Sequence, residues 1–340
     1  RTCEVLCSPW RCCEYRKCGT ILVHGSPQEG KTALVIATEL DHRKSAQQLL
    51  ELGANVNAQN TYSFGSEEKH QPVFPLVVAA LSGRTEVVRL LLEHKANVMQ
   101  VVPQAPGGKV IAGYASLRLA AVTGNDAIIE LLLDAKADID HQEASGGTAL
   151  HGAALTEYTD TTRLLIARGA NINILDQDGM TALHIALERK DLPCSQLLLE
   201  AKSSVAVQKN PAESPLRVAC WSGMVEMIRP LVNANSDIHA CTTDGKSAML
   251  VACAKGQDEV VKVLLELRAS VVTNDAQSPL YVACYFGHTS TVQLLLDNGA
   301  KPSDEDFFAA VWQLQLPTVE LLCANGGVNP DQVRLPGLGS

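Results

Sequence analysis

The sequence predicts an all-α fold built from nine tandem repeats. The first observation is an apolar residue that marks one position of the repeat and recurs at intervals of about 33 residues through the centre of the chain. The nine markers are Leu34, Leu76, Leu117, Leu150, Leu183, Leu216, Met249, Leu280 and Phe307. The second observation is an alanine three residues after every marker, and the third is an apolar pair further along each copy, such as Leu91-Leu92. Because these registers coincide in copy after copy, the chain is a repeat protein.

Each repeat is predicted to contain two short helices joined by a turn. A hydroxyl two residues before the marker can cap the first helix, and the residues with this role are Thr32, Thr148, Thr181, Ser214, Ser247 and Ser278. The next residue is proline in three copies, which suits the first turn of a helix. The apolar pair is the buried stripe of the second helix, and a Gly-Ala step such as Gly53-Ala54 or Gly169-Ala170 ends that helix.

The segments from Gly179 to Ala186 (GMTALHIA) and from Gly146 to His151 (GGTALH) resemble the signature of the ankyrin-repeat family. The resemblance extends over about residues 30–329. It implies an ankyrin-repeat α-solenoid, in which helix-turn-helix repeats carry hairpin fingers along one edge of the stack. The repeats are expected to start near residues 30, 72, 113, 146, 179, 212, 245, 276 and 303.

Some repeats depart from this pattern. Repeats 2 and 3 have longer fingers, around residues 58–71 and 100–112, and these are expected to be the mobile part of the array. Phe74 and Ala115 replace the capping hydroxyl there, so the first helices of both repeats are expected to be less well defined. Repeat 9 is shortened and irregular. Residues 1–29 are expected to be an irregular cysteine-rich leader, and residues 330–340 a disordered tail.

Composition and charge exclude several classes of protein. The chain has 28 Lys and Arg against 37 Asp and Glu, a net charge of −9, and no basic cluster, so nucleic acid is not an expected partner. No apolar run approaches the ~18 residues that span a bilayer, so membrane insertion is not expected. The scattered cysteines fit a reducing compartment, and a monomeric cytoplasmic protein is the expectation.

One segment competes with the repeat interpretation. Residues 25–32 (GSPQEGKT) match the phosphate-binding loop pattern, in which Gly25, Gly30, Lys31 and Thr32 would hold a nucleotide. The repeat register already requires Gly30 and Thr32, however, and helical repeats follow at once where a parallel sheet is needed. We therefore interpret the match as coincidental.

Cysteines and histidines also suggest chemistry, but structural roles explain them. Five cysteines crowd the first 18 residues without the paired spacing of a zinc site, so no metal is expected. Cys220, Cys253 and Cys284 occupy equivalent positions and are expected to be small buried thiols. His151 and His184 stand in the repeat signature, where each ring is expected to brace the start of a helix by hydrogen bonds.

The candidate site lies at the end of the first helices in the C-terminal repeats. Five and six residues after the marker, the resemblance places side chains on the concave groove. In the later repeats these positions hold the aromatic residues Trp221, Tyr285, Phe286 and Trp312, together with Lys255, and repeat 5 contributes Arg189. Aromatic and arginine side chains are the usual anchors of protein interfaces. The alternative is that the aromatics pack over the end of the stack, especially Trp312.

The predicted function is non-catalytic. The chain is expected to be a scaffold or adaptor that binds another protein, or a peptide segment of one, on its concave surface, without a cofactor. One alternative is a regulatory ankyrin array of a larger enzyme or channel. A second is a nucleotide-binding protein that uses Gly25–Thr32.

Overall fold

The computed structural model describes residues 32–63, 70–100, 115–206, 214–242, 245–271 and 278–325. The predicted leader and tail lie outside these residues, as do Gly25, Gly30 and Lys31 and most of the long finger of repeat 3. Within the described residues, helices form nine consecutive pairs, as the nine markers predict.

The first helices of the pairs form one layer. Their bounds are α1 Ala33–Glu39, α3 Pro75–Leu81, α5 Ser116–Val122, α7 Ala149–Leu155, α9 Ala182–Arg189, α11 Pro215–Ser222, α13 Ala248–Lys255, α15 Pro279–Phe286 and α17 Asp304–Trp312. The second helices form the other layer: α2 Arg43–Glu51, α4 Thr85–Glu93, α6 Asp126–Asp134, α8 Thr159–Ala167, α10 Leu192–Glu200, α12 Val225–Asn233, α14 Asp258–Glu266, α16 Thr289–Asp297 and α18 Leu316–Ala324.

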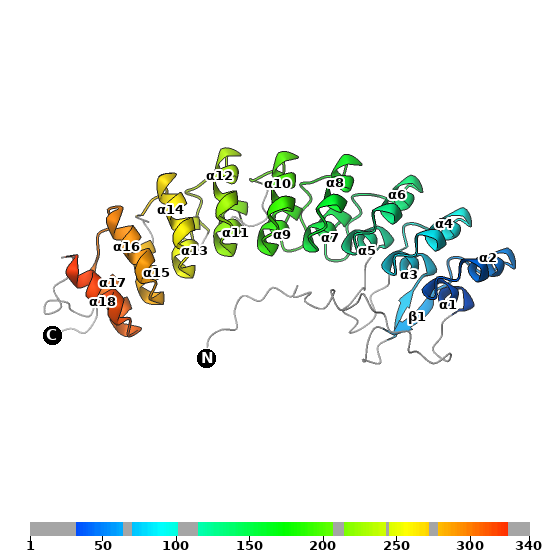
Figure 1. The fold of residues 1–340 in the computed structure, drawn as a ribbon, viewed down its shortest axis with the longest axis horizontal. Coiled ribbons are helices and arrows are strands. Elements are labelled where there is room, and N and C mark those ends of the chain that lie inside the picture. The colour runs from blue at the N-terminus through cyan, green and yellow to red at the C-terminus, as the bar shows by residue number, and fades with distance from the viewer. Residues whose placement is uncertain are drawn as a thin grey trace.

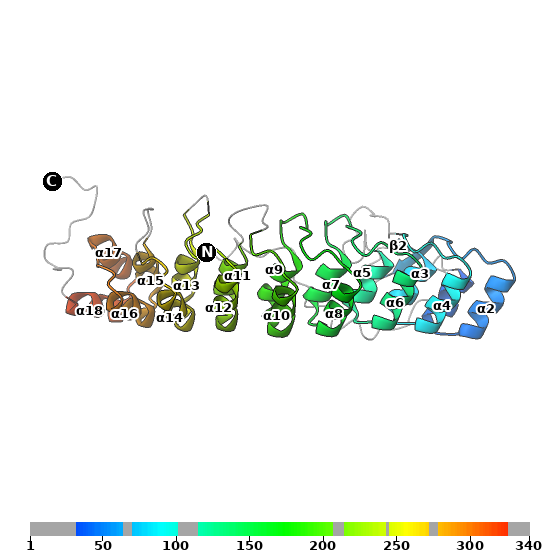
Figure 2. The same ribbon diagram turned by 90° about the horizontal axis from the view of Figure 1, so that it is seen from above.

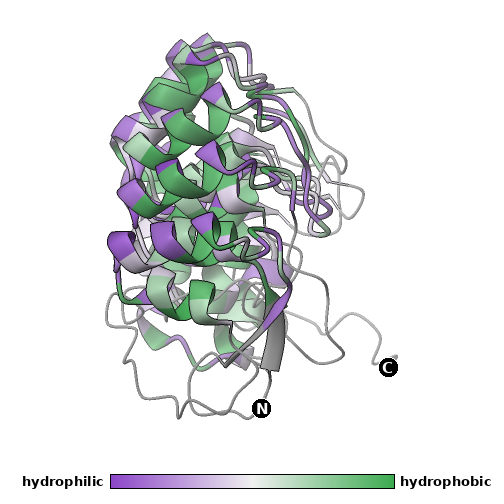
Figure 3. Cartoon of the chain, turned by 90° about the vertical axis from the view of Figure 1, so that its right-hand side faces the viewer, coloured by the Kyte–Doolittle hydropathy of each residue, from purple (hydrophilic) through white to green (hydrophobic). Residues whose placement is uncertain are grey.

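The two layers follow a shallow arc, with the first helices along its inner side (Figure 1). The connections between repeats project together from one edge of the row (Figure 2). Extensive helix contacts join the two helices of one pair and the corresponding helices of adjacent pairs. Seen along the row, hydrophobic residues gather between the layers and hydrophilic ones outside them (Figure 3).

The repeated apolar positions form this interior. All nine markers are buried, and so is the alanine that follows each of them. The small alanine side chain lets neighbouring first helices approach closely, and the leucine of each second helix fills the space between the layers. Leu132, Leu165 and Leu198, for example, have no exposed surface. One continuous core therefore extends through the array.

The two described ends of the long finger of repeat 2 pair as the strands of a β-hairpin. Strand β1 (Asn60–Ser63) pairs antiparallel with β2 (His70–Val73), so that Asn60 lies opposite Val73. The side-chain oxygen of Asn60 accepts a hydrogen bond of 2.7 Å from the N–H of Thr32, which ties the hairpin to the start of α1. The prediction that the fingers of repeats 2 and 3 (residues 58–71 and 100–112) are mobile stays a prediction, because residues 64–69 and 101–112 of these fingers lie outside the described residues.

The prediction that α3 and α5 are poorly defined is wrong. Both helices have seven residues, as α1 and α7 do, although neither Phe74 nor Ala115 supplies a side-chain cap. Pro75 begins α3 and has no N–H that needs an acceptor. At α5, the N–H of Ala115 donates to Glu143 Oε1 at 2.7 Å, so the next repeat supplies the acceptor. In repeat 9 the shortening falls on the connection before α17, because both of its helices have nine residues.

A left-handed residue follows every second helix up to α16. Gly53, Gly169 and Gly299 each have φ of +89°, as the predicted Gly-Ala steps require. In the other repeats the same register holds residues with a side chain, such as Lys95 at φ +62° and Lys136 at φ +68°. An L-residue with a side chain is strained in this conformation.

Replacing Lys95 by glycine is therefore expected to raise the free energy of unfolding. The left-handed conformation costs an L-residue about 1–2 kcal/mol, and the larger chain entropy of glycine in the unfolded state offsets part of the gain. A net increase of about 0.5–1 kcal/mol is expected in urea unfolding. The matched control is Lys44→Gly inside α2, also at an exposed lysine, which should lower stability by about 1 kcal/mol. Equal losses in both variants would contradict the assignment of strain.

Candidate interaction surface

Four exposed aromatic side chains end the first helices of the C-terminal repeats, and we call them the aromatic row. Trp221 belongs to α11, Tyr285 and Phe286 to α15, and Trp312 to α17. Their exposed fractions are 38%, 38%, 52% and 80%. The helices that carry the row, α11, α15 and α17, lie along the inner side of the arc (Figure 1).

Lys255 joins the row by contact with its first member. The side chain belongs to α13, one repeat after Trp221, and its Nζ lies 3.5 Å from the centroid of the Trp221 ring. An ammonium group over an indole face is attracted by the ring quadrupole. Both side chains remain exposed beside this contact.

The middle of the row is a stack of rings in repeat 8. The rings of Tyr285 and Phe286 meet edge to face with centroids 5.1 Å apart. Tyr281 stacks on Tyr285 with centroids 6.3 Å apart, and His288 stacks on Phe286 at the same centroid distance. Sequence analysis missed Tyr281 and His288, although Tyr281 precedes Tyr285 by one helical turn. The four rings of repeat 8 therefore contact one another in a continuous series.

Two of the predicted residues lie at the ends of this surface. Arg189 is the last residue of α9 and is half-buried, one repeat before Trp221. Trp312 ends α17 in the last described repeat, and its exposed fraction of 80% shows that the described residues leave the ring almost uncovered.

Thr32 is the one described residue of the phosphate-loop motif, and it caps the first helix. The hydroxyl of Thr32 accepts from the N–H of Val35 and caps α1, the role that the repeat register predicts. Thr32 also donates its own N–H to Asn60. Within the described ranges, no three His, Cys, Asp or Glu side chains gather in an arrangement that holds a metal ion.

The signature histidines brace the starts of their helices, as predicted. The N–H of Thr148 donates to His151 Nδ1 at 3.2 Å, and Thr181 makes the same contact with His184 at 3.1 Å. His151 Nε2 lies 3.1 Å from the carbonyl oxygen of Met180, which only accepts, so Nε2 carries the proton and Nδ1 is the acceptor. Burial is the main reason that the pKa of His151 is lowered to about 4.

The equivalent cysteines are buried thiols, also as predicted. Cys220, Cys253 and Cys284 have no exposed surface and none is in a disulfide. Burial raises the pKa of Cys220 to about 12, and it raises the pKa values of Cys253 and Cys284 as well. Because the thiolate is the reactive form, these residues are inert packing groups.

Sequence analysis missed a buried ion pair between repeats 3 and 4. Arg118 Nη1 lies 3.0 Å from Glu143 Oε2 and also donates to the hydroxyl of Ser145 at 3.1 Å, while Glu143 Oε1 accepts from Ala115. Burial raises the pKa of Glu143 to about 8, and the Arg118 charge and the Ala115 N–H act in the opposite direction. Arg118 occupies the position that holds His151 and His184 in the next two repeats. This departure from the signature was the feature of the sequence that could have pointed to the ion pair.

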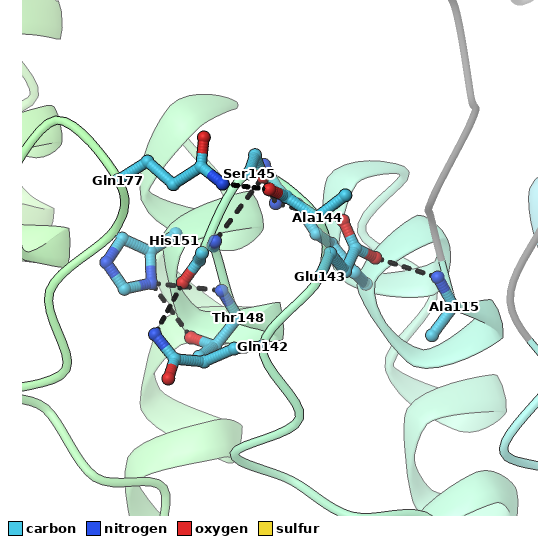
Figure 4. A network of polar contacts seen from close by, with 11 residues as sticks. Ala115, Gln142, Glu143, Ala144, Ser145, Thr148, His151 and Gln177 are labelled. Atoms are coloured by element: carbon cyan, nitrogen blue, oxygen red, sulfur yellow. Dashed lines mark hydrogen bonds and ion pairs between the residues drawn. The ribbon is translucent and has the colours of Figure 1, made fainter. Parts of the chain in front are cut away.

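The finger that carries Glu143 is also joined to the next finger (Figure 4). Gln142 Nε2 donates to the carbonyl oxygens of Gly146 and Leu175, each at 2.9 Å. Gln177 also bonds back to the preceding finger. Its backbone N–H donates to the carbonyl oxygen of Ser145, and its side-chain Nε2 donates to the carbonyl oxygen of Ala144. Fingers 4 and 5 therefore form one hydrogen-bonded unit that is tied to repeat 3 by the ion pair.

A shallow apolar groove lies at the opposite end of the array. It is lined by Ile36, Leu40, Leu49 and Leu52 of repeat 1. Leu52 has an exposed fraction of 86%.

Within the described residues, every helix is too short to cross a lipid bilayer.

Family models match most of the chain. A model of three consecutive ankyrin repeats matches residues 64–143, 117–210 and 216–306, and a model of the single ankyrin repeat matches residues 29–61. These matches agree with the paired helices, the capping Thr-x-x-His segments and the hairpin finger described above. The chain is a member of the ankyrin-repeat family.

Proposed function

We propose that the chain is a non-catalytic scaffold that binds a partner protein, or an extended segment of one, along the inner side of repeats 5 to 9. Ankyrin repeats generally mediate protein–protein interactions. The observation that carries the proposal for this chain is the exposure of Trp221, Tyr285, Phe286 and Trp312 at the same end of their helices. A soluble repeat array has no folding requirement for such residues on an open surface.

The arrangement suits a protein partner better than a small molecule. The aromatic row extends across successive repeats and does not converge on one enclosed pocket, whereas small-molecule sites are concave and bury most of their ligand. Preorganised aromatic rings lose little side-chain entropy on binding, which makes them strong anchors. Lys255 places a cationic group over the Trp221 ring, and Arg189 ends the first helix one repeat earlier, so both can add polar contacts at the rim of a partner.

The test is affinity capture followed by measurement of the dissociation constant for the captured protein. Replacement of Trp221, Tyr285, Phe286 and Trp312 by alanine is expected to weaken binding at least ~100-fold, because each anchor contributes on the order of 1–2 kcal/mol. Circular dichroism checks that the variant keeps its helix content.

The matched control removes exposed apolar side chains that lie outside the row. Leu52→Ala with Met99→Ala does so at exposed fractions of 86% and 39%, and this variant should retain the partner. Equal binding by the row variant and the wild-type chain would refute the assignment of the site. Loss of binding in the control alone would move the site to the N-terminal repeats.

A further inference from the structure

The last described repeat exposes a position that every earlier repeat buries. Four residues after the marker, the side chain has no exposed surface in the first eight repeats, where it is Thr38, Ala80, Ala121, Ala154, Leu187, Cys220, Cys253 or Cys284. In repeat 9 the same position is Val311, with an exposed fraction of 42%. The contrast identifies a position that the following repeat covers.

The second helix shows the same contrast. Twelve residues after the marker, the side chain again has no exposed surface in eight repeats, where it is Ala46, Val88, Ile129, Thr162, Ser195, Ile228, Val261 or Val292. The Thr162 hydroxyl lies 3.6 Å from the sulfur of Cys194 in the next repeat, so this position faces forward along the stack. In repeat 9 it is Val319, which is part-exposed.

The turn between α17 and α18 adds two more apolar side chains. Leu314 and Leu316 have exposed fractions of 82% and 69%. We call Val311, Leu314, Leu316 and Val319 the C-terminal face. A repeat that ends a stack normally presents a polar outer side. The C-terminal face instead has the composition of a repeat that another segment covers.

We propose that residues 326–340 of this chain pack across the C-terminal face. The chain leaves α18 through Asn325-Gly326, which matches Asn298-Gly299 after α16, where Gly299 turns the backbone toward the next repeat. The segment that follows carries four apolar residues, Val328, Val333, Leu335 and Leu338. From the sequence alone, residues 330–340 were expected to be disordered; the exposed face gives them a place to pack.

Reach and tethering favour this occupant over a second copy of the chain. Fifteen residues extend up to roughly 50 Å, which is ample for one pair of short helices. A short tether gives an effective concentration in the millimolar range, far above that of a second molecule in dilute solution.

The test uses the full chain with two pairs of substitutions. Val333→Ser with Leu335→Ser removes apolar side chains from the segment, and Asp331→Ser with Gln332→Ser is the matched polar control. Hydrogen exchange of peptides from α17 and α18 is expected to be roughly tenfold faster in the first variant and unchanged in the second. Peptides from α1 and α2 should not respond in either variant.

A second measurement addresses the face itself. Val311→Ser should accelerate exchange in α17 and α18, and adding it to the Val333→Ser, Leu335→Ser variant should have little further effect, because both changes disrupt one contact. Unchanged exchange in the segment variant, or full additivity with Val311→Ser, would overturn the proposal. So would a concentration-dependent dimer of the wild-type chain that Val311→Ser dissociates, since the occupant would then be a second copy.

Discussion

At a pH above the Glu143 pKa of about 8, where the carboxyl is charged, replacing Glu143 by glutamine is expected to lower the free energy of unfolding by about 3 kcal/mol. Glutamine keeps an acceptor for the N–H of Ala115 but removes the charge that faces Arg118. The Arg118 side chain is 7% exposed, so its guanidinium would remain buried without a counter-charge. Removal of one partner from a buried ion pair typically costs about 3–5 kcal/mol. Urea unfolding followed by circular dichroism measures the loss.

The control for this prediction is the double variant Arg118→Met, Glu143→Gln. Because both charges are then absent, the free energy of unfolding should return to within about 1–2 kcal/mol of the wild-type value. Gly147→Ala offers an independent check, since a Cβ at Gly147 would overlap the Arg118 guanidinium. This alanine should be costly in the wild-type chain and nearly neutral beside Arg118→Met. Equal costs in both backgrounds would show that Arg118 is not held where the ion pair requires it.

Acidification from about pH 6.5 to pH 4 is expected to destabilise the fold through His151 by about 3 kcal/mol. The folded-state pKa of His151 is about 4, below the ordinary value of 6.5. Between these values the unfolded chain binds a proton at this residue and the folded chain does not, so the free energy of unfolding falls as the pH falls. Protonation of Nδ1 would also end its role as acceptor for Thr148.

The measurement compares the wild-type chain with His151→Asn, whose side-chain oxygen can still accept from Thr148. The difference in free energy of unfolding between the two proteins should shrink or change sign toward pH 4. Glu143 has the opposite effect on the free energy of unfolding. Its pKa is raised to about 8 in the folded state, so the folded chain binds this proton before the unfolded chain does as the pH falls from about 8 to 4.5. Subtraction of the two curves cancels that contribution. A pH-independent difference would contradict the role of His151.

The sequence predicted those features that every repeat must share. Markers and alanines are buried because each repeat packs on the next through the same positions. Thr32, Ser214, Ser247 and Ser278 cap their helices, since a local hydroxyl and a nearby N–H are set by spacing along one segment. Such contacts depend on residues close in sequence, which is why periodicity sufficed to find them.

Features that join different repeats were harder to predict. The Ala115 N–H finds its acceptor in Glu143, and Arg118 finds the same side chain from a third position. No local rule links these three residues, because the pairing depends on how two fingers lie side by side. The same reason explains Lys255 over Trp221: the sequence placed both at helix ends, but the 3.5 Å contact requires the stacking geometry of adjacent repeats.

Each helix pair of the array makes its contacts mainly with the adjacent pairs. A small change of tilt at one interface is carried to every repeat beyond it, so displacement grows with distance along the row as at the end of a lever. The ion pair of Glu143 and the linked fingers around it add polar contacts between repeats 3, 4 and 5 to the helix packing. Repeats 6 to 9, which carry the aromatic row, are therefore the repeats that a change of tilt beyond repeat 5 displaces relative to repeats 3 to 5.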